Sequence, residues 1–386
     1  MNNFVYQIPT EVFFGKGQIA NLGRAVRQYS GKVLLVYGGG SIKRSGLYDE
    51  VQAVCKEYGI TAVELAGVEP NPRIETVRAG VELCKKHNLD GILAVGGGSV
   101  IDCAKIISAG AKYDGDAWDL VLNGSLVKET LPLFTVVTIA ATGSEMDRFA
   151  VISNMATNEK IGSFSPLYYP KVSILDPAYT FSVPKNQTAA GTADIMSHVI
   201  DRYFHNVPTA YLQDRLAEAI LKTCIHYGPI AYAEPENYEA RANLMWASSL
   251  AIDNITWRGS EVAPTLHPME HELSAFYDIT HGVGLAILTP HWMKYILSDS
   301  TVDKFAIYGI NVWGIDAGQD RYDIARQAID KTAAFYASMD IPATLREVGI
   351  NDEKIGLMAE KGAKRLKTAY VPLTANDAAA IFRAAL

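Results

Sequence analysis

Short apolar segments separated by stretches of helix length constrain the fold of this chain more than any other feature. The first half contains five segments rich in Val, Ile and Leu, namely KVLLVY (32–37), TAVELAG (61–67), GILAVGGG (91–98), FTVVTIA (134–140) and VSILDP (172–177). Amphipathic stretches such as RIETVRAGVELCKKHN (73–88) lie between them. Apolar runs of this length are typical of strands that are buried on both faces of a parallel sheet and joined by helical crossovers. The first half is therefore predicted to form an α/β layer with a parallel sheet.

The second half shows a different pattern, because helical spacing replaces the strand pattern after about residue 180. Long segments with a helical period include 209–227 and 238–255. A chain of 386 residues is also long for a single core, which favours two domains. We therefore expect an α/β domain over residues 1–180 and an all-helical domain over residues 181–386.

Charge and cysteine content exclude several classes of partner. With 35 basic and 42 acidic residues the net charge is −7, which disfavours nonspecific binding to nucleic acid or an anionic membrane and favours a small-molecule ligand. The N-terminal segment lacks the pattern of a secretory signal, and no segment reaches the roughly 18 apolar residues of a membrane span, so we expect a cytoplasmic protein. The 4 cysteines lie far apart without C-x-x-C spacing and are predicted to be reduced. A bound metal would then have nitrogen and oxygen ligands.

Two of the predicted strands end in the same tetrapeptide, GGGS, at residues 38–41 and 96–99. A glycine turn before a helix lets backbone N–H groups approach a phosphate, and the helix N-terminus adds partial positive charge. The alternative is a pair of tight turns without a ligand. Neither loop matches the G-x-G-x-x-G fingerprint or the P-loop, which argues against a simple Rossmann dehydrogenase or a P-loop kinase. We favour two segments that cradle a pyrophosphate.

A third loop, TIAATGSEMD (138–147), follows the fourth predicted strand. Thr138, Thr142 and Ser144 offer hydroxyl groups there, although Thr142 or Ser144 could instead cap the next segment. Ligands of open α/β sheets lie beyond the carboxyl ends of the strands, so the three loops are predicted to face one crevice.

The first loop also bears on the choice of dinucleotide. Enzymes that prefer NAD commonly place a carboxylate on the adenosine ribose, whereas the GGGS loop offers none and Lys43 follows two residues later. These residues favour NADP(H), with NAD(H) as the alternative.

Three of the 8 histidines lie close together in HPMEHELSAFYDITH (267–281). In a helix His267 and His271 would share one face, and His281 would follow at a turn. Upstream, Asp194 and His198 have the same i, i+4 spacing, which suits half of a divalent-cation site. Each pair alone is more often a surface pair, but the two together favour a shared metal. The remaining histidines are interpreted as structural or exposed: His87, His205, His226 and His291.

The same segment also matches H-x-x-E-H, the zinc motif of one class of peptidase, in which Glu270 would be the general base. Pro268 would then lie in or at the first turn of the motif helix, and the α/β half would have no role. We treat a peptidase as a distant alternative.

The GGGS loops, DIMSH (194–198) and HPMEHELSAFYDITHGVGLAIL (267–288) together resemble the iron-containing (group III) alcohol dehydrogenase family over essentially the whole chain. Within that family the chain is similar to the NADPH-dependent butanol dehydrogenase and aldehyde reductase branch. The resemblance implies an α/β dinucleotide-binding domain with a parallel sheet and an all-helical metal-binding catalytic domain, as in dehydroquinate synthase-like folds. It also implies an active site in the cleft between the domains, and a homodimer.

The resemblance assigns site residues by position. It implies metal ligands at Asp194, His198, His267 and His281, and it places His271 beside the nicotinamide as a catalytic proton relay. The implied cofactor contacts are Gly38, Gly39, Ser41, Gly97, Gly98, Ser99, Asp102, Thr138, Thr142 and Lys160. The metal would be Fe²⁺ or Zn²⁺, and as a Lewis acid it would polarise a small aldehyde or alcohol while hydride passes to or from the nicotinamide.

One segment departs from the family pattern. ATGSE is usually followed by a small or hydrophobic residue and then Asn, whereas this chain has Asp147 and Arg148, and an added ion pair there would alter substrate range or cofactor affinity. Dehydroquinate synthase and glycerol dehydrogenase are the nearest alternatives, but the former needs a basic pocket that the metal-bearing half does not indicate. Trp257, Phe276 and Tyr277 could line an apolar pocket or pack in the core.

Overall fold

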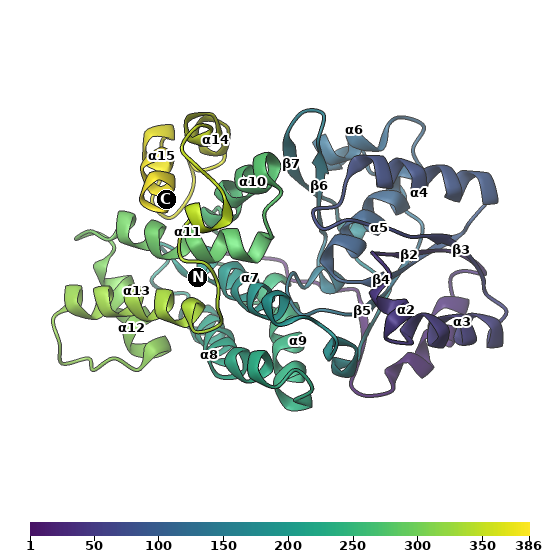
Figure 1. The fold of residues 1–386 in the computed structure, drawn as a ribbon, viewed down its shortest axis with the longest axis horizontal. Coiled ribbons are helices and arrows are strands. Elements are labelled where there is room, and N and C mark those ends of the chain that lie inside the picture. Colours follow the sequence, from purple (N-terminus) through teal and green to yellow (C-terminus); the bar gives the residue numbers. More distant parts are fainter. The chain divides into compact units, whose positions relative to one another are not determined.

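The computed structural model describes residues 1–386, and the chain folds into two compact units (Figure 1). The α/β unit comprises Gln7–Val183 and Pro235–Ser249, and the helical unit comprises Met1–Tyr6, Pro184–Glu234 and Leu250–Leu386. The predicted class, a parallel-sheet α/β domain followed by a helical domain, is confirmed. Two segments belong to the unit opposite to the one that the hydrophobic pattern predicts. The first residues of the chain join the helical unit, and a segment of the second half joins the α/β unit.

A six-stranded parallel sheet forms the centre of the α/β unit, in the order β1-β8-β5-β4-β2-β3. Its strands are β1 (Glu11–Phe14), β2 (Lys32–Tyr37), β3 (Thr61–Leu65), β4 (Gly91–Gly96), β5 (Leu133–Val137) and β8 (Val172–Leu175). All five apolar segments form strands, whereas the edge strand β1, with only 4 residues, was not predicted. Because β5, β4 and β2 are neighbours, the loops that follow them leave the same edge of the sheet side by side.

Helices cover both faces of this sheet (Figure 1). The helices of the unit are α1 (Leu22–Arg27), α2 (Ser41–Arg44), α3 (Leu47–Glu57), α4 (Ile74–His87), α5 (Gly98–Gly110), α6 (Ala117–Leu122) and most of α9 (Tyr238–Ile252). Leu34 and Val36 of β2 belong to one apolar core, and Val33 and Leu35 belong to the other. Successive side chains of a strand point to opposite faces, so this alternation shows that the sheet is buried on both sides.

The α/β unit also contains an antiparallel hairpin, β6 (Phe149–Asn154) and β7 (Glu159–Phe164), which was not predicted. Asn158 lies in its turn with a φ of 49°, a conformation that Asn tolerates better than most residues. β7 is only partly buried. A half-buried strand carries few apolar residues, so the segment did not stand out from a loop in the sequence.

In the helical unit α7 packs against α8 and α11, and α10 packs against α11 and α14. Its helices are α7 (Lys185–Tyr203), α8 (Tyr211–Ala233), the end of α9, α10 (Leu266–Tyr277), α11 (His281–Ile296), α12 (Val302–Trp313), α13 (Arg321–Ala337), α14 (Ile355–Ala363) and α15 (Ala375–Ala384). Across the chain, single 3₁₀ turns occupy Gln18–Asn21, Gly124–Leu126, Ser144–Met146, Pro166–Tyr168, Pro177–Thr180 and Arg346–Val348. None of the helices is both long and apolar enough to cross a membrane.

A buried ion pair joins α5 to the loop before β6. The ammonium of Lys105, which is 0% exposed, contacts the Asp147 carboxylate and donates a hydrogen bond of 2.7 Å to the carbonyl oxygen of Phe149. Burial raises the pKa of the Asp147 carboxyl, and the nearby ammonium opposes that rise. Asp147 thus forms its ion pair with Lys105 and not with Arg148. The Arg148 guanidinium lies 4.9 Å from the centre of the Phe164 ring.

Replacing Lys105 by methionine should lower the free energy of unfolding by about 3–5 kcal/mol, because it leaves a buried carboxylate without its counter-charge. Urea unfolding followed by tryptophan fluorescence measures this loss. The control is Lys43→Met, which removes a solvent-exposed ion pair with Glu64 and should change stability little. Small and equal losses in the two variants would show that the Lys105 ion pair does not support the unit.

Candidate functional site

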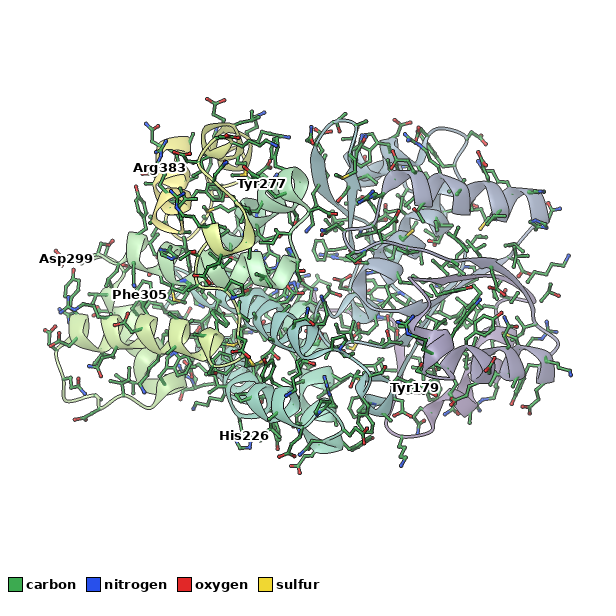
Figure 2. The ribbon with its side chains drawn as sticks, viewed as in Figure 1. Tyr179, His226, Tyr277, Asp299, Phe305 and Arg383 are labelled. Carbon is green, nitrogen blue, oxygen red and sulfur yellow. The ribbon has the colours of Figure 1, made fainter.

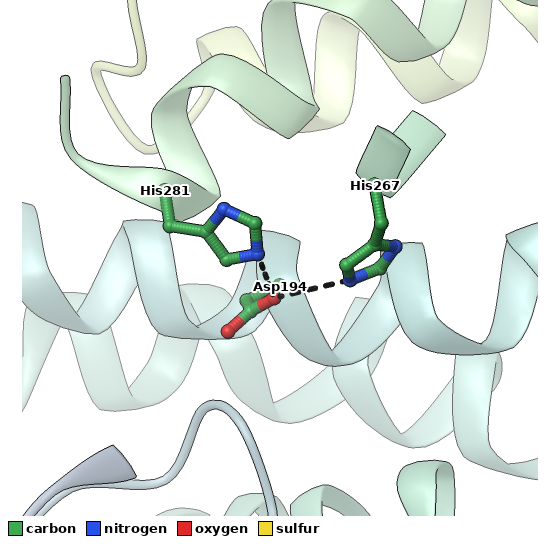
Figure 3. Close-up of side chains that lie close together, drawn as sticks. All are labelled: Asp194, His267 and His281. Atoms are coloured by element: carbon green, nitrogen blue, oxygen red, sulfur yellow. Dashed lines mark ion pairs between the residues drawn. The ribbon is translucent and has the colours of Figure 1, made fainter. Parts of the chain in front are cut away.

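Three imidazoles from three helices converge on one carboxylate oxygen of Asp194 in the helical unit. Asp194 and His198 lie one turn apart on α7, His267 is in the first turn of α10, and His281 is the first residue of α11. The Nε2 atoms of His198, His267 and His281 lie 3.7, 3.9 and 3.8 Å from Oδ1 of Asp194. Figure 3 shows His267 and His281 directed at Asp194 from two sides. The structure thus brings together the four residues predicted as metal ligands.

The distances between these donor atoms suit coordination of one divalent cation better than direct hydrogen bonds. Separations of 3.7–3.9 Å are too long for hydrogen bonds. Oδ1 of Asp194 and Nε2 of His267 are buried and have no hydrogen-bond partner. Two ligands that each lie about 2.1 Å from one tetrahedral ion would be roughly 3.4 Å apart, which is close to the observed separations. Three imidazole nitrogens with one carboxylate oxygen are a ligand set that Fe²⁺ and Zn²⁺ both accept.

Helix geometry and one glycine explain the convergence. Asp194, His198 and Asp201 follow one another on α7 at i, i+4 and i+7, so they share one face of the helix. α11 approaches α7 at Gly282, where an added Cβ would lie only 2.0 Å from the carbonyl oxygen of Ala190. Any larger residue would push the helices apart. The close approach places the first residue of α11 against the carboxylate on α7.

Asp201 holds His267, a role that the sequence analysis missed. Its carboxylate accepts the backbone N–H groups of Thr265 and Leu266 at 2.8 Å and of His267 at 3.1 Å, so it caps the N-terminus of α10. Oδ2 of Asp201 also lies 2.7 Å from Nδ1 of His267. Burial acts to raise the pKa of the Asp201 carboxyl, but the bonds from His267 and the backbone outweigh burial and lower it. The i+7 spacing from Asp194 is the pattern that would have indicated this residue.

Glu270, considered above as a peptidase base, contacts His281 instead. Its Oε2 is hydrogen-bonded to Nδ1 of His281, and its Oε1 accepts a hydrogen bond from the hydroxyl of Ser274. In an H-x-x-E-H peptidase His267 and His271 would share the metal, and Glu270 would face a water molecule. The observed contacts do not fit a peptidase.

His271 lies beside the cluster rather than within it. Its ring centroid is 6.5 Å from that of His267 and 5.7 Å from that of His281. One of its ring nitrogens also lies within 4.8 Å of donor atoms of Glu270 and His281, a second group that could hold an ion, so the place of His271 beside the metal and its relay role both stay predictions. Within the cluster, burial lowers the pKa of His198 to about 3, so its imidazole is neutral at neutral pH, the form that binds a metal.

The other four histidines lie away from the cluster, as expected. His226 is exposed on the outer surface of α8 (Figure 2), and His87 is exposed at the end of α4. His205 is buried and pairs with Asp214 at 2.9 Å. His291 is half-buried in α11.

Cationic side chains cover the aromatic residues that were considered for an apolar pocket. The guanidinium of Arg202 lies 4.5 Å from the centre of the Trp257 ring. The ammonium of Lys354 lies 5.4 Å from the ring centre of Phe276 and 5.1 Å from that of Tyr277, which is marked in Figure 2. Contacts of this kind tie the rings into the protein, which favours packing over a substrate pocket.

In the α/β unit both glycine loops connect a strand to a helix, as predicted. Gly38 and Gly39 follow the end of β2 and Ser41 is the first residue of α2, while Gly97, Gly98 and Ser99 lie where β4 passes into α5. A Cβ on Gly98 would lie 2.3 Å from Oγ1 of Thr142, so this glycine lets the third loop pack against the N-terminus of α5. The backbone N–H groups and the partial positive charge of a helix N-terminus suit a pyrophosphate.

The remaining residues implied as cofactor contacts lie near the same helix. The carboxylate of Asp102 on α5 accepts hydrogen bonds from the Ser144 hydroxyl at 2.6 Å and from the Val151 N–H at 2.9 Å. Burial raises the pKa of Asp102, while Lys105 and Lys160 act in the opposite direction. The N–H of Thr138 bonds to the last residue of β4 at 3.1 Å. Lys105 was not predicted, although its position three residues after Asp102 on one helix is the pattern that would have indicated it.

Two family models match the chain. The model described as iron-containing alcohol dehydrogenase matches residues 9–177. The model described as Fe-containing alcohol dehydrogenase family, C-terminal, matches residues 188–386. The two matches fall on the α/β part and the helical part of the sequence.

Individual relatives agree with these models. NADH-dependent butanol dehydrogenase A of Clostridium acetobutylicum is 57% identical over 386 residues, which cover 99% of each chain. The NADPH-dependent aldehyde reductase YqhD of Escherichia coli is 38% identical over 94% of this chain and 93% of its own. A crystal structure of NADH-dependent butanol dehydrogenase A from Thermotoga maritima aligns with a TM-score of 0.94 and 37% identity, over 100% of this chain and 99% of the other. The resemblance inferred from the glycine loops and histidines is confirmed, and the chain belongs to the iron-containing alcohol dehydrogenase family.

Proposed function

We propose that this protein is a metal-dependent alcohol dehydrogenase and aldehyde reductase that interconverts small primary alcohols and their aldehydes. The observation that carries the proposal is the set of three imidazole nitrogens within 3.9 Å of one buried carboxylate oxygen of Asp194. Family membership supplies the reaction class and the use of a nicotinamide cofactor. Two relatives at 57% and 58% identity are named butanol dehydrogenases, which supports a short aliphatic substrate.

The chain's own residues have three tasks in this mechanism. Asp194, His198, His267 and His281 bind either Fe²⁺ or Zn²⁺. When bound, the cation would supply Lewis acidity and the reduced nicotinamide would supply hydride. The N–H groups at the N-terminus of α5 bind the pyrophosphate of the dinucleotide. The imidazole of His271 holds the proton that is returned to the product alcohol, because imidazoles exchange protons near neutral pH.

Contacts of Lys43 weaken the case for NADPH. The Lys43 ammonium lies 3.6 Å from Oε2 of Glu64, a carboxylate that also accepts hydrogen bonds from the hydroxyls of Tyr37 and Tyr48. The charge that was expected to attract a 2′-phosphate is therefore partly compensated. Relatives at 46–58% identity are named NADH-dependent, whereas the relative named NADPH-dependent aldehyde reductase is 38% identical. We propose NADH as the preferred reductant, against the expectation from the first glycine loop.

Initial rates of butanal reduction with NADH and with NADPH test both the reaction and the cofactor. We expect a higher kcat/KM with NADH, because the Lys43 ammonium already pairs with Glu64 and is less available to a 2′-phosphate. A higher kcat/KM with NADPH would favour the earlier expectation. No oxidation of either reduced cofactor by short aldehydes would contradict the proposed reaction.

Alanine variants separate the roles of the two neighbouring histidines. His267→Ala removes a proposed ligand and should lose both bound metal and turnover. His271→Ala should keep its metal while kcat falls by about 10²–10⁴, the usual contribution of a proton-transfer group. Metal analysis of the purified variants beside steady-state kinetics makes the comparison, and equal loss of metal in both would contradict the division of roles.

We also propose that the protein is a cytoplasmic homodimer, as the resemblance implied. β1 is an edge strand of the parallel sheet, and its outer backbone groups offer a place for a second strand. Phe14 and Trp246 of the same unit are 38% and 39% exposed and form an edge-to-face pair with ring centroids 5.7 Å apart. A second copy of the chain would cover these rings.

Light scattering of the purified protein should therefore give about twice the chain mass of 42.0 kDa. Trp246→Lys, which places a charge on the proposed contact, should shift the mass toward that of one chain. A wild-type protein of one chain mass would contradict the homodimer.

A further inference from the structure

Glu270 is an acidic residue whose side chain is fully buried. Its side chain is 0% exposed, although it is an acidic residue in a 12-residue helix. It fits against the backbone of α11, where a Cβ on Gly284 would lie 2.9 Å from Cγ of Glu270. Burying a carboxylate costs several kcal/mol unless hydrogen bonds and a counter-charge compensate it. The position therefore calls for a partner that stabilises the charge.

The contacts of Glu270 lead toward the proposed metal ligands. One carboxylate oxygen is hydrogen-bonded to Nδ1 of His281, whose Nε2 faces Oδ1 of Asp194 at 3.8 Å. The other oxygen accepts a hydrogen bond from the Ser274 hydroxyl, one helical turn later. An imidazole that donates from Nδ1 has its lone pair on Nε2, which is the atom that faces Asp194.

Asp201 makes the same contact with His267, but it has a second task. It accepts three backbone N–H groups at the start of α10, so its removal would disturb the helix as well as the imidazole. The contacts described for Glu270 are with two side chains, the His281 imidazole and the Ser274 hydroxyl. Glu270 is thus the carboxylate whose effect on a metal can be measured with the least disturbance of the fold.

We infer that Glu270 is a positioning residue that fixes His281 with Nδ1 protonated and Nε2 available to the metal, and that it strengthens metal binding by this contact. The inference rests on the metal site of the proposed function. A carboxylate behind a histidine ligand orients the ring and raises its basicity, and losing such a partner commonly weakens metal binding about 10- to 100-fold.

The test is the dissociation constant of Zn²⁺ for the metal-depleted protein, measured in competition with a chromophoric chelator. Glu270→Gln keeps the shape of the side chain and removes its charge, and we expect it to bind Zn²⁺ about 10- to 100-fold more weakly. The melting temperature of the metal-depleted variant should stay close to that of the wild type. A loss of affinity at unchanged stability is a result that a purely structural role would not give.

Glu272→Gln is the matched control. Glu272 lies on the same helix and is 3% exposed, but it faces Lys361 at 3.9 Å and Arg365 at 3.6 Å instead of a histidine. Its substitution should leave Zn²⁺ affinity unchanged, even if it lowers the melting temperature. Ser274→Ala is the second variant, because it removes the donor to Glu270 without altering a charge. It should weaken Zn²⁺ binding by roughly 2- to 10-fold, the equivalent of one hydrogen bond.

The outcomes separate this inference from the proposed function. A wild-type protein that binds no Zn²⁺ tightly would overturn the metal site itself. Tight binding that is equal in wild type, Glu270→Gln and Ser274→Ala would overturn the role of Glu270 and leave the proposed function standing. Equal weakening in Glu270→Gln and Glu272→Gln would also overturn it, because the effect would then follow from packing. If Glu270→Gln does not fold, the affinity of Ser274→Ala decides.

Discussion

Buried negative charge is the constraint on which the helical unit depends. Asp194, Asp201 and Glu270 expose 4%, 2% and 0% of their side chains and lie around the same group of imidazoles. Imidazole nitrogens lie close to each of these carboxylates. A divalent cation would compensate two of the three charges, which is the physical reason for placing one there. The helices that supply these residues are held close enough because Gly282 has no side chain.

The α/β unit meets the same constraint with its own residues. Asp102 and Asp147 are buried near one another, and the ammonium of Lys105 supplies the positive charge between them. Asp102 is thereby fixed beside the N-terminus of α5, where the dinucleotide is proposed to bind. One unit compensates buried carboxylates with a lysine, and the other is proposed to do so with a metal ion. A metal ion would, in addition, polarise a carbonyl group as a Lewis acid.

The sequence predicted most of what local pattern controls. The buried strands and the helical second half followed from apolar runs and helical spacing. The i, i+4 spacing indicated a shared metal site, whereas the choice of His267 and His281 rather than His271 beside Asp194 and His198 came from the family resemblance. β1 and the β6–β7 hairpin did not, because short or half-buried strands carry little hydrophobic pattern. The sequence also did not predict that Met1–Tyr6 join the helical unit and Pro235–Ser249 the α/β unit, because this depends on tertiary packing rather than on local propensity.

The supporting residues of the site show the same limit. Asp201 shares a helix face with Asp194 and His198, so the sequence contained its pattern although the prediction stopped at the ligands. Glu270 was considered only as the base of a peptidase, a distant alternative, and its contact with His281 was not predicted. Its contact with His281 depends on how α10 and α11 pack, which no local spacing reveals.

The most direct measurement is an anomalous-difference map from crystals grown with Fe²⁺ or Zn²⁺. The structure predicts one strong peak in the helical unit, about 2.0–2.2 Å from a carboxylate oxygen of Asp194 and from Nε2 of His198, His267 and His281. A peak held instead by Glu270 and His271, or no ordered ion near Asp194, would contradict the central claim.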